Sequence, residues 1–360
     1  MDKIFNFSIT QAMLPQDILA IAGDELGTVV TALMTNRQKL RELQAHAEST
    51  LRELLGVPLN YRILFMSGGA SEQFSAIPLN LLSEHKCADY VLTGFMSKSA
   101  SLEAKKYGDI VVAASSAGAM PAYSVVPEMQ KSDFRPDSDY VHICYNNSLY
   151  GTKFHYIPDT GNIPLVADMT SSLLSEPIDV MKFGMIYAGA QANIGLEGMT
   201  VVIVRDDLMG RARVDTPSVI NYKVIAESDP IFATVPVLNL YLASLTFDKL
   251  TALGGLSEMK RKNERKASLL YDYIDSQTYY TSPVSKKSRS MMNVVFMTSD
   301  AALDAKFVEE AEACGLFGLA RDKSVGGMCA SIYNSMPYEG VERLVAFMRK
   351  FAFENPKFTA

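Results

Sequence analysis

The sequence predicts an α/β protein with two parts, a large mostly parallel-sheet domain and a smaller α+β domain after it. Short apolar runs alternate with segments that carry apolar residues at helical spacing, as a layered α/β fold requires. After residue 250 the pattern changes to a long, charged, amphipathic segment. A chain of 360 residues has room for both parts. We therefore expect a large domain with an N-terminal arm over residues 1–250 and a small domain over 251–360.

The expected elements of the large domain alternate between helix and strand. Helical spacing predicts helices over 15–22, 37–55, 73–82 and 97–107. Apolar, partly β-branched runs predict strands over 61–65, 90–92, 110–113, 140–145, 164–167, 185–188 and 200–204. Strands buried on both faces form parallel sheets, whose ligands collect at the carboxyl ends of the strands. The small domain is expected to hold helices over 256–276, 301–314 and 340–353 and strands over 289–297 and 329–333.

Composition excludes several classes of function. A formal net charge of −6 gives no basic face, so nucleic acid is not expected as a partner. No run of about 18 apolar residues suggests a membrane span, and the first residues lack the apolar stretch of a signal peptide. A cytoplasmic location is therefore expected. The four cysteines and four histidines show no metal-ligand spacing, so no metal site is expected.

The turn Gly68-Gly69-Ala70-Ser71 lies between an expected strand and an expected helix. Successive backbone N–H groups at a helix N-terminus bind anions, which makes this turn a candidate phosphate site. The alternative is an ordinary tight connection between a strand and a helix. Both interpretations stay open on these residues alone.

Asp168 closes the apolar run PLVAD at the end of an expected strand. A carboxylate in this position suits a pyridine cofactor, because an anion keeps the ring nitrogen protonated. Alternatively, Asp168 caps the next segment through Thr170 or Ser171.

Residues 184–195, GMIYAGAQANIG, resemble the cofactor-lysine segment YAGAQKNIG of phosphoserine aminotransferases, which are class V pyridoxal-phosphate (PLP) enzymes. The resemblance extends along the chain through IFNFS, AMLP, LGVPLNY, GGASEQFSAIPLNLL, EAKKYG, VADMTSSLLSEPIDV, VGGM, ASIYNSMP and EGV. It implies the type I PLP-dependent transferase fold and a homodimer with its sites at the subunit interface.

On the cofactor side, the resemblance implies that most binding residues are kept. Ala70, Ser71 and Gln191 match the phosphate cup, and Thr234 matches a threonine that reaches the phosphate from the partner subunit. Asp168 matches the ring-nitrogen carboxylate. Ser148 replaces a threonine and keeps its hydroxyl.

Other cofactor positions depart from the family. Ala192 stands where the family has its Schiff-base lysine. Met96 replaces the tryptophan that stacks on the pyridine ring, in a chain with no tryptophan. Ala233 replaces an asparagine.

The substrate side departs further. Ile9-Thr10-Gln11 replaces Ser-Gly-Pro, and Thr35-Asn36-Arg37 replaces Ser-His-Arg. Arg321-Asp322-Lys323 replaces Gly-His-Arg, and Cys329 replaces the arginine that clamps the substrate carboxylate. The candidate substrate contacts are therefore Asn36, Arg37, Lys323 and Cys329.

An alanine methyl can neither form an imine nor carry a proton, so we expect no transamination through a lysine Schiff base. We expect the chain to bind PLP, pyridoxamine phosphate or another phosphorylated small molecule without a covalent link. One alternative is new chemistry in the old cavity, with Cys329 as a nucleophile rather than a space-filling side chain. Another is a phosphoserine aminotransferase inactivated by a lysine-to-alanine change. A purely structural role as a dimeric scaffold stays open.

Overall fold

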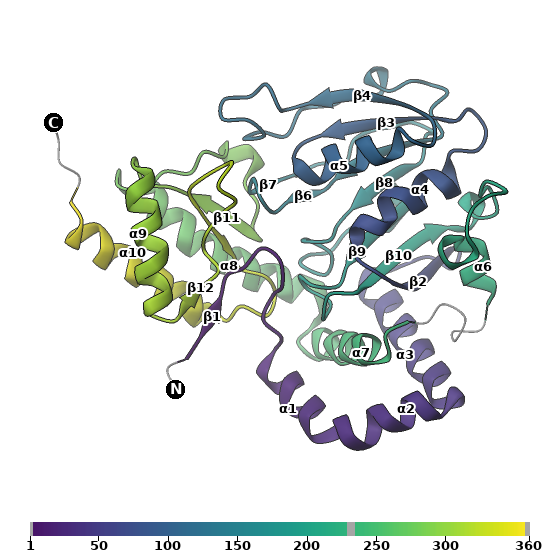
Figure 1. The fold of residues 1–360 in the computed structure, drawn as a ribbon, viewed down its shortest axis with the longest axis horizontal. Helices are drawn as coiled ribbons and strands as arrows, with labels where there is room; N and C mark the ends of the chain where they lie inside the picture. Colours follow the sequence, from purple (N-terminus) through teal and green to yellow (C-terminus); the bar gives the residue numbers. More distant parts are fainter. Residues whose placement is uncertain (1–2, 229–234, 357–360) are drawn as a thin grey trace.

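The computed structural model describes residues 3–228 and 235–356 (Figure 1). A seven-stranded sheet with the order β2-β10-β9-β8-β5-β3-β4 forms the centre of the large domain. Strand β10 runs antiparallel to β2 and β9, and the remaining pairs of the sheet are parallel. The strands are β2 (Tyr61–Ser67), β3 (Cys87–Leu92), β4 (Asp109–Ser115), β5 (Tyr140–Cys144), β8 (Leu165–Asp168), β9 (Met185–Gly189) and β10 (Met199–Arg205).

Successive residues of the central strands enter two different cores, one on each face of the sheet. Ile63 and Phe65 pack with helices α3 (Arg37–Leu55) and α7 (Val237–Ala252), whereas Leu64 and Met66 pack with α4 (Gln73–Leu81), α5 (Phe95–Ala104) and α6 (Tyr222–Glu227). Side chains alternate between the faces of a strand, so apolar runs without polar interruptions match burial on both sides. The mostly parallel sheet predicted from these runs is confirmed.

The small domain contains α8 (Gly255–Asp275), β11 (Asn293–Phe296), α9 (Ala301–Ala313), β12 (Leu316–Phe317), β13 (Met328–Ser331) and α10 (Tyr338–Glu354). Strands β11 and β13 pair antiparallel. The N-terminal arm crosses to this domain, where β1 (Phe5–Asn6) pairs in parallel with β12 (Figure 1). Phe5 and Phe7 are fully buried in the small-domain core. The arm, which was expected to belong with residues 1–250, therefore packs with the second domain.

The helix expected over residues 15–22 continues much further. Helix α1 (Gln16–Glu25), a π-helical turn (Leu26–Val30) and α2 (Thr31–Thr35) form one helical stretch that leads to α3. This stretch is long and apolar enough, by length and composition alone, to cross a membrane, a property not expected from the sequence. Ile18, Ala22, Val30 and Leu33 pack against Tyr241 and Leu242 of α7.

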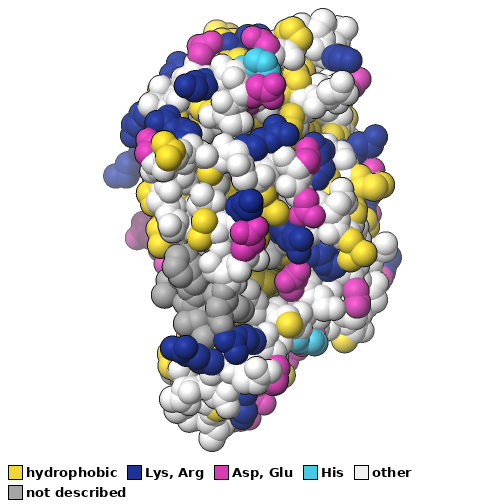
Figure 2. Space-filling model, turned by 90° about the vertical axis from the view of Figure 1, so that its right-hand side faces the viewer, with side chains coloured by type: hydrophobic (Ala, Val, Ile, Leu, Met, Phe, Trp, Pro, Cys, Tyr) yellow, Lys and Arg dark blue, Asp and Glu magenta, His cyan; other side chains and the backbone are white. Residues whose placement is uncertain are grey.

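Short pieces complete the fold. A two-stranded ribbon, β6 (Asn146–Asn147) with β7 (Thr152–Lys153), lies beyond the end of β5. Single helical turns cover Ala70–Glu72, Lys131–Asp133, Val180–Lys182, Asp206–Leu208, Ser218–Ile220 and Lys286–Ser288. On the face drawn in Figure 2, cationic and anionic side chains are interspersed rather than gathered into one basic area.

Candidate cofactor site

Asp168 ends β8 in the middle of the sheet, next to Cys144 of β5 and Tyr187 of β9. It is 3% exposed. Its Oδ1 accepts hydrogen bonds from the backbone N–H of Thr170 at 2.9 Å and from the Thr170 hydroxyl at 2.6 Å. The local capping interaction considered from the sequence is therefore present.

This cap leaves Asp168 without a counter-charge. No Lys, Arg or His forms an ion pair with its carboxylate in the part of the chain that the structure describes. Burial raises the pKa of Asp168, and the hydrogen bonds from Thr170 only partly oppose that rise. A buried carboxylate is costly unless it is paired, so a protonated pyridine nitrogen would supply what this position lacks. The residues present fit the ring end of a pyridine cofactor.

A buried chain of aromatic groups lies behind Asp168, and sequence analysis did not find it. His142 Nε2 lies 2.9 Å from the hydroxyl of Tyr187, and Tyr187 is the neighbour of Asp168 across β8 and β9. The ring of Tyr90 stacks on His142 with centroids 4.7 Å apart. Burial lowers the pKa of His142 to about 3, so the ring is neutral. The only sequence signal was a histidine inside the apolar strand YVHIC.

The glycine-rich turn has the geometry of an anion site. Gly68 has φ +100°, a left-handed conformation that favours glycine. Thr200 Oγ1 donates to the Gly68 carbonyl at 2.9 Å, which fixes the turn to β10. Ala70 and Ser71 begin the helical turn that leads into α4, where the first N–H groups of a helix lack intrahelical partners.

A carboxylate lies beside the same turn. The Ser71 hydroxyl donates to Glu72 Oε2 at 3.1 Å. A Cβ built on Gly68 would lie 3.0 Å from Glu72 Cδ, and one on Gly69 would lie 3.4 Å from Glu72 Oε2. The Glu72 side chain thus folds over the two glycines. The sequence predicts a phosphate site at this turn, but the negative charge of Glu72 would repel a phosphate there.

The segment that carries Ala192 is held by the N-terminal arm. The Gln191 carbonyl accepts from the N–H of Ala12 at 2.9 Å. Gln11 Nε2 donates to the carbonyls of Gln191 and Gly195, both at 3.3 Å, and Gln11 Oε1 accepts from the N–H of Glu197 at 3.1 Å. Gln11, a substrate-side departure from the family, therefore ties the arm to this segment.

Ala192 itself is 4% exposed. Its methyl group belongs to a small buried apolar cluster with Ala12, Met292 and Tyr333, against which Met291 packs. The side chains of this cluster are apolar apart from the Tyr333 hydroxyl, whereas the resemblance predicts an amine at position 192.

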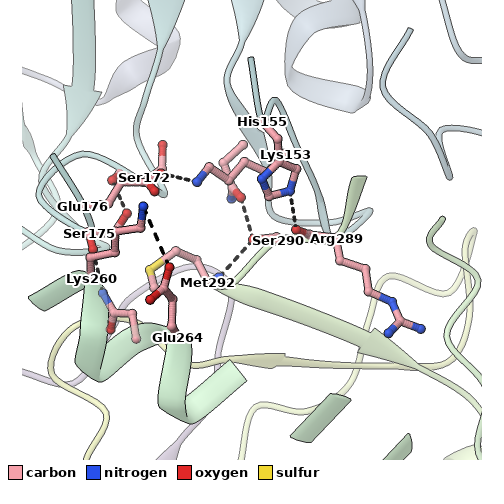
Figure 3. Close-up of polar contacts among 12 residues, drawn as sticks. Lys153, His155, Ser172, Ser175, Glu176, Lys260, Glu264, Arg289, Ser290 and Met292 are labelled. Carbon is pink, nitrogen blue, oxygen red and sulfur yellow. Dashed lines mark hydrogen bonds and ion pairs between the residues drawn. The ribbon is translucent and has the colours of Figure 1, made fainter. Parts of the chain in front are cut away.

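Among residues 3–228 and 235–356, Lys153 and Lys266 are buried, and both of their amines have hydrogen-bond or ion-pair partners. Lys153 forms an ion pair with Glu176 (Figure 3). Lys266 donates to the carbonyls of Ile332, Tyr333 and Met336 at 2.9, 2.6 and 3.1 Å. Burial lowers the pKa of Lys266 to about 7. Lys182 and Lys323 are exposed.

Met96 and Ser71 come together at a shallow hollow of about 520 Å³ that Glu72 and Phe74 also line. Met96 is half-buried at the start of α5. A thioether there offers contact with a ring but no aromatic stacking. The structure thus brings the expected phosphate turn and the expected ring contact to one place.

Cys329 lies on β13 and is fully buried. It packs with Val284, Val295 and Ile9, and its Sγ lies 3.7 Å from the carbonyl of Ser148. Burial raises the pKa of the Cys329 thiol to about 11. A protonated, enclosed thiol is a poor nucleophile, so these surroundings favour the space-filling role.

The candidate substrate contacts are not gathered near Asp168 within one chain. Asn36 caps α3 by accepting from the N–H groups of Gln38 and Lys39. Asn36 and Arg37 are exposed at the start of α3, at the lower edge of the molecule in Figure 1. Lys323 is exposed on the loop before β13. Ala233 and Thr234 lie outside the described residues.

The mostly parallel sheet and the helices that cover it form the type I PLP-dependent transferase fold. The model of the class V aminotransferases matches residues 4–344. Phosphoserine aminotransferase of Pasteurella multocida is 44% identical over 99% of this chain and 100% of its own. The chain belongs to the phosphoserine aminotransferase family of class V aminotransferases.

Solved structures agree with this assignment. A phosphoserine aminotransferase studied for radiation damage of its Schiff base superposes with a TM-score of 0.94 and 38% identity over 99% of this chain and 100% of the other. The PLP-bound phosphoserine aminotransferase of Trichomonas vaginalis gives a TM-score of 0.88 and 35% identity over 96% of this chain and 100% of the other.

Proposed function

We propose that this chain binds PLP or pyridoxamine phosphate reversibly in the family site and does not transaminate through a lysine Schiff base. The observation that carries the proposal is Ala192, buried among apolar side chains at the family's lysine position. The buried lysines of the described residues are engaged with Glu176 or with backbone carbonyls. A phosphoserine aminotransferase of solved structure contains a Schiff base, but an alanine methyl cannot form one.

Different residues of this chain would contact the pyridine ring, the phosphate and the O3′ side of the cofactor. Asp168 would accept the pyridine N–H, and Ala70, Ser71 and Gln191 would face the phosphate. Ser148 keeps a hydroxyl for the O3′ side. When bound, the cofactor supplies an electron sink for carbanions. The negative charge of Glu72 would repel the cofactor phosphate. We therefore expect PLP to bind more weakly than it would to the same turn without this carboxylate.

Substrate recognition is proposed to have changed as well. A bidentate arginine–carboxylate contact is strong and oriented, and the buried thiol of Cys329 cannot replace it. Asp322 adds a negative charge on the neighbouring loop, where its carboxylate accepts from the Ser324 N–H at 2.9 Å. Both changes disfavour phosphoserine as a ligand.

A second candidate is phosphoserine aminotransferase activity itself, and the identity over the whole chain favours it. Restoring Ala192→Lys and assaying phosphoserine with 2-oxoglutarate separates the two. Turnover in the restored protein would mean that the remaining site is still competent. No turnover would support divergence beyond position 192.

A homodimer is part of the proposal. Leu19, Ile21, Leu26 and Met34 of the α1–α2 stretch are 43–68% exposed, and a second copy of the chain would cover them. Leu26→Glu with Met34→Glu should shift sedimentation toward the monomer. Met120→Glu, at an apolar side chain that is 98% exposed elsewhere, is the matched control. A cytoplasmic location is retained as part of the same proposal.

Equilibrium dialysis tests the main proposal. PLP should bind to the purified protein, be removed completely by dialysis, and compete with pyridoxamine phosphate for the same site. PLP that survives dialysis under denaturing conditions after borohydride treatment would refute a purely non-covalent mode.

A further inference from the structure

A pocket of about 740 Å³ lies against the segment that carries Ala192. Its wall includes Ala192, Asn193, Ile194 and Gly195, together with the N-terminal arm, α7, α8 and the residues before α10. The pocket residues do not include Asp168, Ser71 or Met96. Among the positions assigned to the cofactor site, the pocket therefore shares only Ala192.

Cationic side chains surround this pocket in a chain whose net charge is −6. Three of them have carboxylate partners: Lys3 with Glu339, Lys249 with Asp17, and Arg261 with Glu258. The ammonium of Lys266 is fixed by three backbone carbonyls.

Lys262 and Arg265 differ from these. Neither forms an ion pair within residues 3–228 and 235–356, and Glu258, the acidic group that interacts with Lys262 through space, is itself paired with Arg261. Lys262 is half-buried, and the guanidinium of Arg265 lies 4.0 Å from the ring centroid of Tyr338. Stacking on an aromatic face orients a guanidinium and leaves its N–H edge available for an anion. On α8, Lys262 and Lys266 are four residues apart and Arg265 is next to Lys266, so all three share one side of the helix.

The remainder of the pocket is largely apolar. Its lining includes Met13, Leu14, Leu250, Leu253 and Met259. Leu250 and Met259 are buried in the core of the large domain, and the others are half-buried. Walls of this kind favour a ligand with an apolar body, whereas a hydrated inorganic ion would gain nothing from them.

We propose that the pocket binds a small amphipathic anion, with its phosphate or carboxylate at Lys262 and Arg265 and its apolar body against α7 and the N-terminal arm. This site differs from the cofactor site and does not depend on the proposed function. Because Ala192, Asn193, Ile194 and Gly195 line the pocket, a ligand there would contact the segment that carries position 192.

Calorimetric titration with phenyl phosphate and with benzoate tests the proposal on the whole protein. One molecule per chain should bind, more weakly as salt is raised, because the contact is charge-assisted. Lys262→Gln and Arg265→Gln should each weaken binding about tenfold. Lys260→Gln is the matched control, because Lys260 lies on the same helix but is paired with Glu264 at 3.8 Å.

Inorganic phosphate and benzyl alcohol should bind much more weakly, since each lacks one half of the required chemistry. The ratio of the affinities for phenyl phosphate and benzoate shows which head group is preferred. Binding of either probe that is weakened by Lys262→Gln and Arg265→Gln supports the proposal. Binding that survives both α8 substitutions would place the anion at the Gly68 turn and overturn it. Equal losses with Lys260→Gln, or equal binding of benzyl alcohol, would also overturn it. Unchanged thermal unfolding of each variant excludes misfolding as the cause.

Discussion

Ala192 packs with Met292 in a small buried apolar cluster that also contains Ala12 and Tyr333. Ala192 follows β9 and Met292 precedes β11, so this cluster joins two distant segments of the chain. We propose that the contact stands where the family carries its Schiff-base lysine. The titratable groups near the proposed cofactor site and in the core lead to four predictions.

Asp168→Asn should weaken PLP binding by roughly ten- to hundredfold, because a charge-assisted hydrogen bond of about 1.5–3 kcal/mol is lost. The same change should stabilise the unliganded protein at neutral pH. Burial raises the folded-state pKa of Asp168, so the folded protein binds the proton more tightly and its stability falls as pH rises through that window. Fluorescence titration and urea unfolding measure the two effects. If Asp168→Asn binds PLP more weakly and the unliganded variant is also less stable to urea, then the Asp168 carboxylate is not an uncompensated charge in the unliganded protein.

Glu72→Gln should increase the affinity for pyridoxamine phosphate by about three- to tenfold, since a charge close to the bound phosphate is removed. The gain should shrink as salt is added. Glu103→Gln is the control, because Glu103 lines the same hollow but is paired with Lys106. If both variants gain equally, the effect belongs to the overall charge and not to the turn.

Cys329 should resist alkylation by iodoacetamide at neutral pH, whereas Cys314 should react. Cys314 is exposed, while Cys329 is fully buried and its pKa is raised to about 11. Peptide mapping after a timed reaction gives both rates in one sample. Faster labelling of Cys329 than of Cys314 would support the alternative in which Cys329 acts as a nucleophile.

His142 should make the protein sensitive to acid. Its folded-state pKa of about 3 lies below the ordinary value of 6.5, so the unfolded chain binds more protons between these values. The stability contributed by neutral His142 is therefore complete above about pH 6.5 and is lost as pH falls toward 3, a change of about 3–5 kcal/mol. Urea unfolding at pH 7 and pH 5 should show a smaller difference for His142→Asn than for the unmodified chain. An equal difference would assign the acid sensitivity to other groups.

The fold could be predicted largely from the sequence because the strands are apolar on both faces. Residues 61–65 and 200–204 differ little from β2 and β10. The pairing of β1 with β12 could not be predicted, because two-residue strands some 300 positions apart leave no periodic signal. The continuation of the first helix through the π-helical turn was missed because Gly23, Asp24, Glu25, Gly27 and Thr28 interrupt the apolar pattern after residue 22.

The site could be predicted in part. Ser71 and Met96 line one hollow, and the cap of Asp168 by Thr170 was one of the interpretations considered. The side chain of Glu72 folds back over Gly68, a contact that depends on a rotamer and not on a motif. Arg37 is exposed at the start of α3, so its predicted substrate contact belongs to the proposal of a homodimer.

Mass spectrometry after borohydride reduction decides whether this chain can hold PLP through a covalent bond. The unmodified chain and Ala192→Lys are each incubated with PLP, reduced, denatured and weighed, with Ala192→Met as the control for side-chain size. We expect the added cofactor mass on Ala192→Lys alone, and overpacking of the cluster should cost that variant about 1–3 kcal/mol of stability. A stoichiometric adduct on the unmodified chain would show that another amine reaches the cofactor and would contradict the proposed non-covalent mode.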